Sequence, residues 1–295
     1  MHRYDDPTYR FDFSLIEEKT ETCKNWGKWG PDDEWGTINY AGNAERKAAA
    51  TLVKRGEVFS LGLNFDSEGP QKGEGLTASR WNPIHTMLAT GTDAVQGKQT
   101  APGKKIPSQY ADDAVSLPLQ CGTQWDSLAH VFNNGKMWNG YDATLVGSRG
   151  AEKNAIHKMR NKMVGRGVLL DIARWAGVDC LEGGTAIDAD DLNQCAKDQG
   201  VEIKRGDFVI YRTGHMEACL SQGDWGTYAG GDAPGVSFHT VDWMKDMEIA
   251  AICADTWGCE VIPNETDDVF QPWHWIVIPQ IGITMGEIFY LKDLA

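Results

Sequence analysis

The chain has 295 residues, of which 41% are hydrophobic and 24% are charged, a composition typical of a globular protein with a sizeable core. Its 42 acidic and 28 basic residues give a net charge of −14. This charge argues against a nucleic acid or an anionic membrane as partner, because no positive field would offset phosphate repulsion. It is compatible with a small-molecule substrate, even an acidic one, because a bound metal can dominate the local potential.

Residues 1–45 are polar and predict an N-terminal arm that carries three tryptophans, Trp26, Trp29 and Trp35. Glycines and a proline between the tryptophans interrupt regular structure. We expect the indoles to anchor the arm to the body of the protein, with contact to a partner subunit as the alternative. No repeat or long linker follows, so residues 46–295 are interpreted as one domain.

Helical and extended patterns then alternate and predict a mixed α/β fold. Asp188, with Asp191 three residues later, indicates the N-terminus of a helix. The other elements expected are helices at 43–52 and 240–246 and strands at 58–65, 166–173, 205–214 and 249–254.

Residues 66–107 are weakly patterned, and a long irregular stretch inside a compact domain is often functional. Within it, Trp81 is a candidate wall for a planar ligand, and His85 is a candidate substrate-binding group. A structural, hydrogen-bonded role is the alternative for His85.

Seven cysteines are present without a Cys-x-x-Cys pair, so reduced thiols are expected rather than a disulfide framework. The first thirteen residues are charged and lack the apolar stretch of a signal peptide. No apolar run has the length of a membrane span. These features predict a cytoplasmic protein.

Polar side chains concentrate between residues 120 and 130, directly after an apolar-rich run at 114–119 that is a candidate strand. Gln120, Gln124, Asp126 and His130 surround a Gly-Thr pair, and an extended backbone could aim the last three at one point. Aspartate and histidine bind metals, but glutamine is an uncommon zinc ligand. A polar turn that satisfies buried backbone groups is therefore the alternative to a metal site.

This segment resembles the hallmark of the cyclase-like metal-dependent hydrolase family, which includes bacterial kynurenine formamidase and isatin hydrolase. The family motif reads His-x-Gly-Thr-His-x-Asp-x-Pro-x-His, and the Gly-Thr pair, Asp126 and His130 match it. Glutamines stand in place of the first two histidines, and Leu128 replaces the proline. The resulting Gln-x-x-x-Gln-x-Asp spacing resembles the metal motif of trans-dienelactone hydrolase, a distant branch of the family.

The resemblance extends from about Trp26 to Leu291 and implies a swivelling β/β/α domain that covers residues 46–295. It also implies a divalent metal, zinc or manganese, and a homo-oligomer, because family members are often dimers or tetramers. The implied metal ligands are Gln120, Gln124, Asp126, His274 and Glu287. Neutral glutamine oxygens predict weaker metal binding than in a relative with histidines at those positions.

His130 is implied as the catalytic general base or acid rather than a ligand. Trp125 joins Trp81 and His85 as a candidate substrate-binding residue.

The implied reaction is the opening of a small lactone or cyclic amide by metal-activated water. The two glutamines favour a small unsaturated lactone. The alternatives are an aryl formamidase, an isatin-type amide hydrolase, or a catalytically silent relative that binds a small ligand. The sequence contains no Gly-x-Ser-x-Gly, which disfavours a serine hydrolase.

Overall fold

The computed structural model describes residues 1–73, 77–104 and 108–295. Contacts divide the chain into two compact units, a larger one formed by residues 1–62 with 123–295, and a smaller one formed by residues 63–122. The predicted arm belongs to the larger unit. The predicted irregular stretch lies in the smaller unit, and its residues 74–76 and 105–107 lie outside the described residues.

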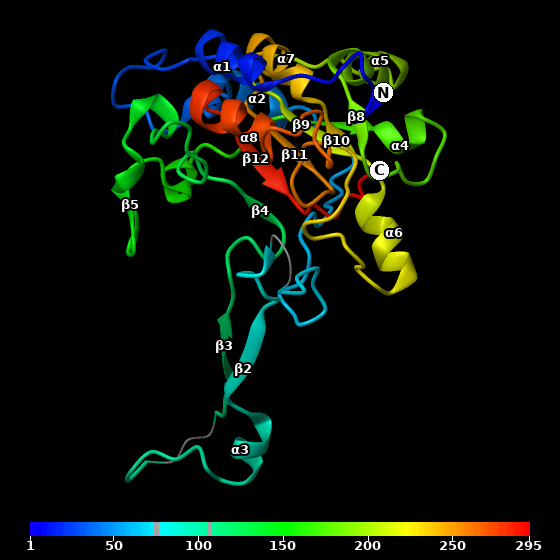
Figure 1. Ribbon diagram of the computed structural model, residues 1–295. Coiled ribbons are helices and arrows are strands. Elements are labelled where there is room, and N and C mark those ends of the chain that lie inside the picture. Colours follow the sequence, from blue (N-terminus) through cyan, green and yellow to red (C-terminus); the bar gives the residue numbers. More distant parts are fainter. Residues whose placement is uncertain (74–76, 105–107) are drawn as a thin grey trace. The chain divides into compact units, whose positions relative to one another are not determined.

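A five-stranded sheet forms the centre of the larger unit (Figure 1). Its strand order is β4-β12-β11-β9-β7, in which β4 pairs antiparallel with β12 and all other neighbours are parallel. The strands span Gln124–Trp125 (β4), Gly167–Asp171 (β7), Phe208–Arg212 (β9), Ala251–Ala254 (β11) and Thr284–Glu287 (β12). Strand β11 is buried throughout, which explains its wholly apolar sequence.

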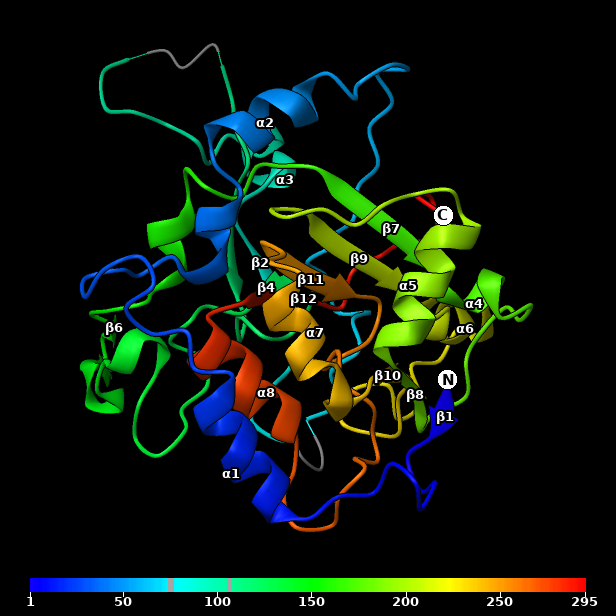
Figure 2. The same ribbon diagram turned by 90° about the horizontal axis from the view of Figure 1, so that it is seen from above.

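Helices α1, α5, α7 and α8 lie over one face of this sheet (Figures 1 and 2). The helices of the larger unit are α1 (Phe13–Thr22), α2 (Asn43–Ala50), α4 (Ile172–Trp175), α5 (Ala189–Asp198), α6 (His215–Gln222), α7 (Val241–Asp246) and α8 (Pro272–Ile276), and α8 continues into a π-helical turn at Val277–Ile281. Within the described ranges, no helix combines the length and the apolar character needed to cross a membrane.

Two further sheets and short 3-10 turns complete the larger unit. One sheet has the order β1-β8-β10, from His2–Arg3, Thr185–Ile187 and Gly235–Val236, and the other pairs β5 (Val146–Gly147) with β6 (Gly150–Ala151). The 3-10 turns lie at Gly36–Tyr40, Trp138–Gly140, Ala143–Leu145, Ile156–Met159 and Phe238–Thr240.

The smaller unit contains an antiparallel pair of strands, β2 (Ile84–Ala89) and β3 (Asp112–Ser116). Helix α3 (Gly91–Val95) follows β2, and Thr90 and Asp93 form a capping box at its start. Every residue of β3, and every residue of β2 except Ala89, is exposed.

The N-terminal arm packs on the segment that leads into β12. Trp26 and Trp29 pack against the core, as expected, and the Trp26 indole donates to a carbonyl of the π-helical turn at 2.6 Å. The backbone N–H of Thr37 donates to the carbonyl of Gly282 at 2.9 Å. Gly282 has a φ of +85°, and a Cβ at this position would lie 2.6 Å from the ring of Trp138. The arm therefore contacts the segment before β12 at Gly282, where the ring of Trp138 leaves no space for a side chain.

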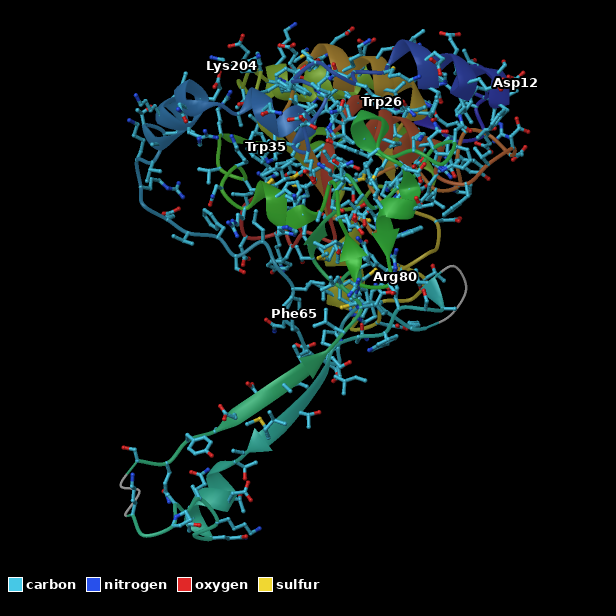
Figure 3. All side chains as sticks on the ribbon, turned by 90° about the vertical axis from the view of Figure 1, so that its left-hand side faces the viewer. Asp12, Trp26, Trp35, Phe65, Arg80 and Lys204 are labelled. Atoms are coloured by element: carbon cyan, nitrogen blue, oxygen red, sulfur yellow. The ribbon has the colours of Figure 1, made fainter. Side chains whose placement is uncertain are left out.

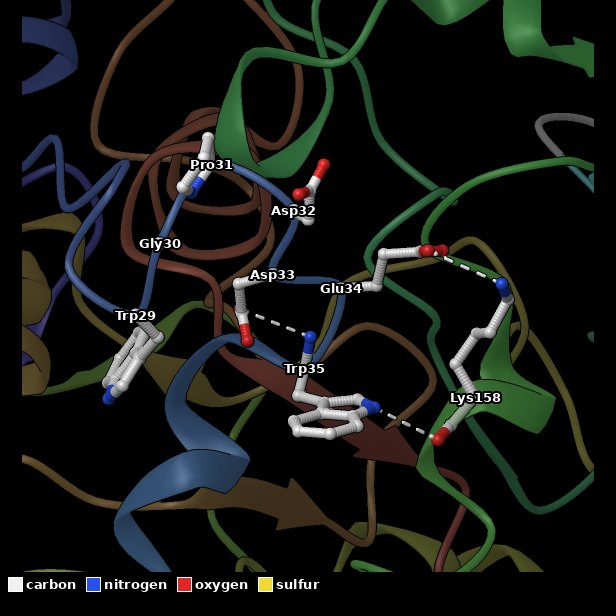
Figure 4. A pocket seen from close by; sticks show the side chains of 8 residues that line it. All are labelled: Trp29, Gly30, Pro31, Asp32, Asp33, Glu34, Trp35 and Lys158. Atoms are coloured by element: carbon white, nitrogen blue, oxygen red, sulfur yellow. Dashed lines mark hydrogen bonds and ion pairs between the residues drawn. The ribbon is translucent and has the colours of Figure 1, made fainter.

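A cavity of about 510 Å³ opens over the arm and is lined by residues 29–35 and Lys158 (Figure 4). Two of the three acidic side chains that line the cavity, Asp33 and Glu34, contact other residues of the protein. Asp33 is buried and accepts hydrogen bonds from the N–H of Gly36 and the indole of Trp138, at 2.8 and 3.1 Å. Glu34 lies 3.3 Å from the Lys158 ammonium group. Asp33 therefore stabilises the turn of the arm, and Glu34 joins the arm to Lys158.

Most of the elements predicted from the sequence are present. The helix expected at 43–52 is α2, the one at 240–246 is α7, and Asp188 caps α5 in a reciprocal capping box. The strands expected at 205–214 and 249–254 are β9 and β11. The strand expected at 166–173 ends earlier, because Asp171 caps helix α4.

Two strand predictions need correction. Residues 58–65 alternate between apolar and polar side chains but form no strand, because no strand in the described part of the chain pairs with them. The run at 114–119 is extended only as far as Ser116, where it belongs to the exposed strand β3 and not to the central sheet.

Candidate metal centre

Asp126, His274 and Glu287 form a compact cluster in the larger unit. Each residue offers one ligand atom, and these atoms all lie within 4.8 Å of one another. The three residues are 1%, 5% and 4% exposed, respectively. Buried charged groups of this kind are normally paired or bound to a metal. The structure therefore brings together three of the five predicted ligands from distant parts of the chain.

Pairing between β4 and β12 places the two carboxylates side by side. Gln124 is opposite Glu287 in the antiparallel register, and Asp126 directly follows β4. The N–H of Asp126 donates to the carbonyl of Met285 at 2.7 Å, and the hydroxyl of Thr284 donates to the carbonyl of Asp126. Backbone contacts on both sides of its Cα therefore fix the position of Asp126.

Glu260 orients the histidine of the cluster. Its carboxylate accepts from the His274 backbone N–H at 3.1 Å and lies 2.5 Å from Nδ1 of the same residue. It also accepts from the Trp273 N–H at 3.3 Å, so it caps the N-terminus of α8. With Nδ1 engaged, Nε2 of His274 is directed toward Glu287, whose Oε1 lies 3.3 Å away.

The cluster has a strongly negative field. Burial alone would lower the pKa of His274, but hydrogen bonds and charge from Glu260 and Glu287 outweigh burial and raise this pKa to about 10. The same field favours a cation among these side chains.

Of the two glutamines predicted as metal ligands, Gln124 contacts the cluster, whereas Gln120 belongs to the smaller unit. The Gln124 amide nitrogen donates to Oε2 of Glu287 at 2.6 Å, which joins this glutamine to the cluster. Gln120 belongs to the smaller unit, where its carbonyl accepts from the Gln71 amide at 3.5 Å. Its part as a metal ligand stays a prediction.

His130 lies beside the cluster at a more exposed position. Its Nε2 is 3.9 Å from Oδ2 of Asp126, and its side chain is 36% exposed, against 1% for Asp126. An imidazole at this position can exchange protons with solvent and still approach the buried carboxylate. This geometry suits the predicted role in proton transfer.

Of the three predicted substrate-binding residues, Trp125 belongs to the larger unit and faces away from this cluster. Trp125 alternates with Gln124 and Asp126 along β4, so its side chain points to the opposite face of the sheet. There its ring packs edge-on against Phe208 and Phe289 and lines an apolar cavity of about 320 Å³.

The other two candidates lie in the smaller unit. Trp81 is 47% exposed, and His85 on β2 lies 2.8 Å from a carboxylate oxygen of Asp113. Their roles in substrate binding stay predictions.

Two acidic residues near the strand ends have roles that the sequence did not reveal. Glu260 lies fourteen residues before His274 and outside any regular pattern, so no spacing indicated that it would contact the imidazole. Asp255 follows β11 and accepts from the N–H groups of Thr213 and Gly214 at 2.8 and 2.7 Å. Burial raises the pKa of Asp255 to about 6 although these hydrogen bonds oppose the shift.

Comparison with known proteins gives relatives over most of the chain. The family model "Cyclase: Putative cyclase" matches residues 61–261, and no curated protein matches the sequence. A crystal structure described as a novel cyclase is 33% identical, with a TM-score of 0.81, and the match covers 92% of this chain and 88% of that chain.

Two isatin hydrolases share the fold at lower sequence identity. Isatin hydrolase A from Ralstonia solanacearum has a TM-score of 0.56 at 17% identity, over 84% of this chain and 86% of its own. Isatin hydrolase A from Labrenzia aggregata has a TM-score of 0.55 at 13% identity, over 84% and 87%. The predicted mixed α/β fold is confirmed, and the chain belongs to the cyclase family.

Proposed function

We propose that this chain is a metal-dependent hydrolase that opens a small lactone or cyclic amide. The observation that carries the proposal is the buried cluster of Asp126, His274 and Glu287, whose ligand atoms lie within 4.8 Å of one another. A site that hydrolyses carbonyl compounds with a metal needs such ligands and space for water and substrate.

The donor groups fit a divalent ion. Asp126 and Glu287 would contribute carboxylate oxygens and His274 would contribute Nε2, with amide oxygens from Gln124 and Gln120 as further ligands. A set dominated by oxygen suits manganese as well as zinc. When bound, the ion would polarise the substrate carbonyl and make a water molecule more acidic.

Side chains of the protein would orient the ligands and transfer protons. Glu260 holds the His274 ring in one tautomer, with Nδ1 engaged and Nε2 facing the cluster. Gln124 fixes one oxygen of Glu287 through its amide nitrogen. His130 would take a proton at Nε2 during attack on the carbonyl and return it to the leaving oxygen or nitrogen.

The choice of a lactone rests on the two glutamines of the Gln-x-x-x-Gln-x-Asp segment, in which this chain resembles trans-dienelactone hydrolase. The isatin hydrolases with the same fold make a cyclic amide the second candidate. A panel of unsaturated lactones, isatin and aryl formamides would separate these substrate classes.

Removal of the metal is expected to abolish hydrolysis. The purified protein should contain close to one equivalent of a divalent ion, measured by inductively coupled plasma mass spectrometry. Dialysis against a chelator should remove both the ion and the activity, and added zinc or manganese should restore activity. Full activity in metal-free protein would contradict the mechanism, and protein that purifies without the ion and hydrolyses no substrate of the panel would indicate a silent ligand-binding relative.

Glu260→Gln is expected to weaken metal binding by about 10–100-fold, because residues that orient metal-binding histidines typically contribute that much. The neutral amide retains the size of the side chain but no longer provides a carboxylate to hold Nδ1 of His274. Metal affinity would be measured by competition with a chromogenic chelator.

Glu265→Gln provides the matched control. Glu265 is also buried and also accepts a backbone N–H, that of Phe238 at 2.7 Å, but it contacts none of the three clustered residues in the hydrogen bonds described. Equal losses of metal affinity in both variants would show that general destabilisation, and not orientation of His274, causes the effect.

A further inference from the structure

The residue before Glu260 has a strained backbone conformation. Cys259 has a φ of +53°, in the left-handed region that residues with a Cβ seldom adopt. The N–H of Glu260 donates to the carbonyl of Gly258 at 2.5 Å, so the chain turns tightly at Cys259. A conformation of this kind costs free energy and persists only where surrounding contacts hold it. Because Glu260 directly follows this turn, the turn determines where its carboxylate lies.

Residues of strands β9, β10 and β12 contact Cys259. Its carbonyl accepts from the hydroxyl of Tyr211 and from the N–H of Val236, the latter at 3.0 Å. Its thiol donates to the carbonyl of Gly286 at 3.3 Å. A Cβ at Gly235 would lie 2.1 Å from the carbonyl oxygen of Cys259, so the backbones approach closely there. Among these contacts, the hydroxyl of Tyr211 can be removed without a change to the backbone.

Strand β9 directs the ring of Tyr211 to the face of the sheet that carries the cluster. Ile210 lines the apolar cavity on the opposite face, and successive side chains of a strand alternate between faces. Side chains densely fill the larger unit (Figure 3), and Tyr211 is completely buried. Burial raises the pKa of Tyr211 well above its ordinary value, so the hydroxyl keeps its proton and remains a donor.

We propose that Tyr211 is a positioning residue that acts on His274 through the turn at Cys259 and through Glu260. Its hydroxyl holds the turn, and the turn places the carboxylate of Glu260 at 2.5 Å from Nδ1 of His274. The orientation of His274 matters for metal binding only if this residue is a ligand, and in that respect the inference rests on the proposed function.

Tyr211→Phe tests the proposal, with Tyr228→Phe as the matched control. Both rings are fully buried, and the hydroxyl of Tyr228 donates to the carbonyl of Asp255 at 2.8 Å, earlier in the same loop. Each variant retains its ring and loses one hydrogen bond to a backbone carbonyl. Urea denaturation should therefore show similar losses of stability in the two variants. Only Tyr211→Phe should change the surroundings of His274.

The nitrogen NMR signal of His274 Nδ1 reports the contact with Glu260. It would be recorded at one pH on the full chain after dialysis against a chelator, and assigned by its absence in His274→Asn. In Tyr211→Phe the signal should move toward its position in Glu260→Gln, whereas in Tyr228→Phe it should stay in place. An unmoved signal in Tyr211→Phe, or equal shifts in both tyrosine variants, would overturn the proposal.

A double-mutant cycle adds a readout that depends on the metal. Tyr211→Phe should weaken zinc binding by about 2–10-fold, the range that one hydrogen bond represents, in competition with a chromogenic chelator. In protein that already carries Glu260→Gln it should weaken binding no further, because the two residues act in sequence. Losses that multiply would show that Tyr211 acts independently of Glu260 and would also overturn the proposal. A shifted Nδ1 signal in protein that binds no zinc would support the positioning role and contradict the proposed function.

Discussion

Replacing His130 with glutamine is expected to lower kcat by about 10²–10⁴-fold, the usual contribution of a positioned acid or base. Nε2 of His130 lies 3.9 Å from Oδ2 of Asp126, and the ring is the more exposed of the two groups. Glutamine preserves the polarity and approximate length of the side chain but cannot accept and return a proton. The rate of the chemical step should therefore fall while substrate binding changes little.

Metal content distinguishes proton transfer from ligation at His130. The His130→Gln variant should retain its divalent ion, because the clustered ligand atoms belong to Asp126, His274 and Glu287. His157→Gln, at an exposed histidine of a 3-10 turn, serves as the control and should behave as the parent protein. Loss of the metal in His130→Gln would reassign this residue as a ligand, and an unchanged kcat would remove it from the mechanism.

Gly282→Ala is expected to destabilise the protein by about 2–5 kcal/mol. The φ of +85° alone costs an alanine about 1–2 kcal/mol. The new methyl group would also lie 2.6 Å from the buried ring of Trp138, and overpacking of this kind typically adds about 1–3 kcal/mol. Urea denaturation of the two proteins would measure the difference in the free energy of unfolding.

Gly27→Ala separates the two contributions. Gly27 has a similar φ of +78°, but a Cβ there meets no atom within 4 Å. This variant should lose only the backbone contribution of about 1–2 kcal/mol. If both variants lost the same amount, the close approach between Gly282 and the ring of Trp138 would not limit stability.

Elements whose determinants are local could be predicted from the sequence. The capping box of Asp188 and Asp191 lies within four residues, and the apolar run of β9 follows directly on a turn. These patterns determine element type without reference to the rest of the chain. The strand expected at 58–65 failed because strand formation also needs a partner, which the local sequence does not specify.

The residues of the candidate site also divide into those that the sequence indicated and those that only the fold reveals. Family resemblance indicated Asp126, His274 and Glu287, which the fold brings together. Glu260 was missed, because its contact with His274 depends on how the loop before α8 folds back. Trp125 was predicted to bind substrate, but its side chain lies on the other face of the sheet from Gln124 and Asp126. The two-residue period of an extended strand already indicates this difference.

The antiparallel contact between β4 and β12 has a consequence for biosynthesis. It joins Asp126 to Glu287, residues separated by more than half of the polypeptide. A ribosome-bound chain that has not yet released Glu287 cannot assemble the full ligand set, however well its earlier segments have folded. Loading of the proposed metal would therefore be a late event in maturation, and fragments from prematurely terminated translation would lack one of the three clustered residues.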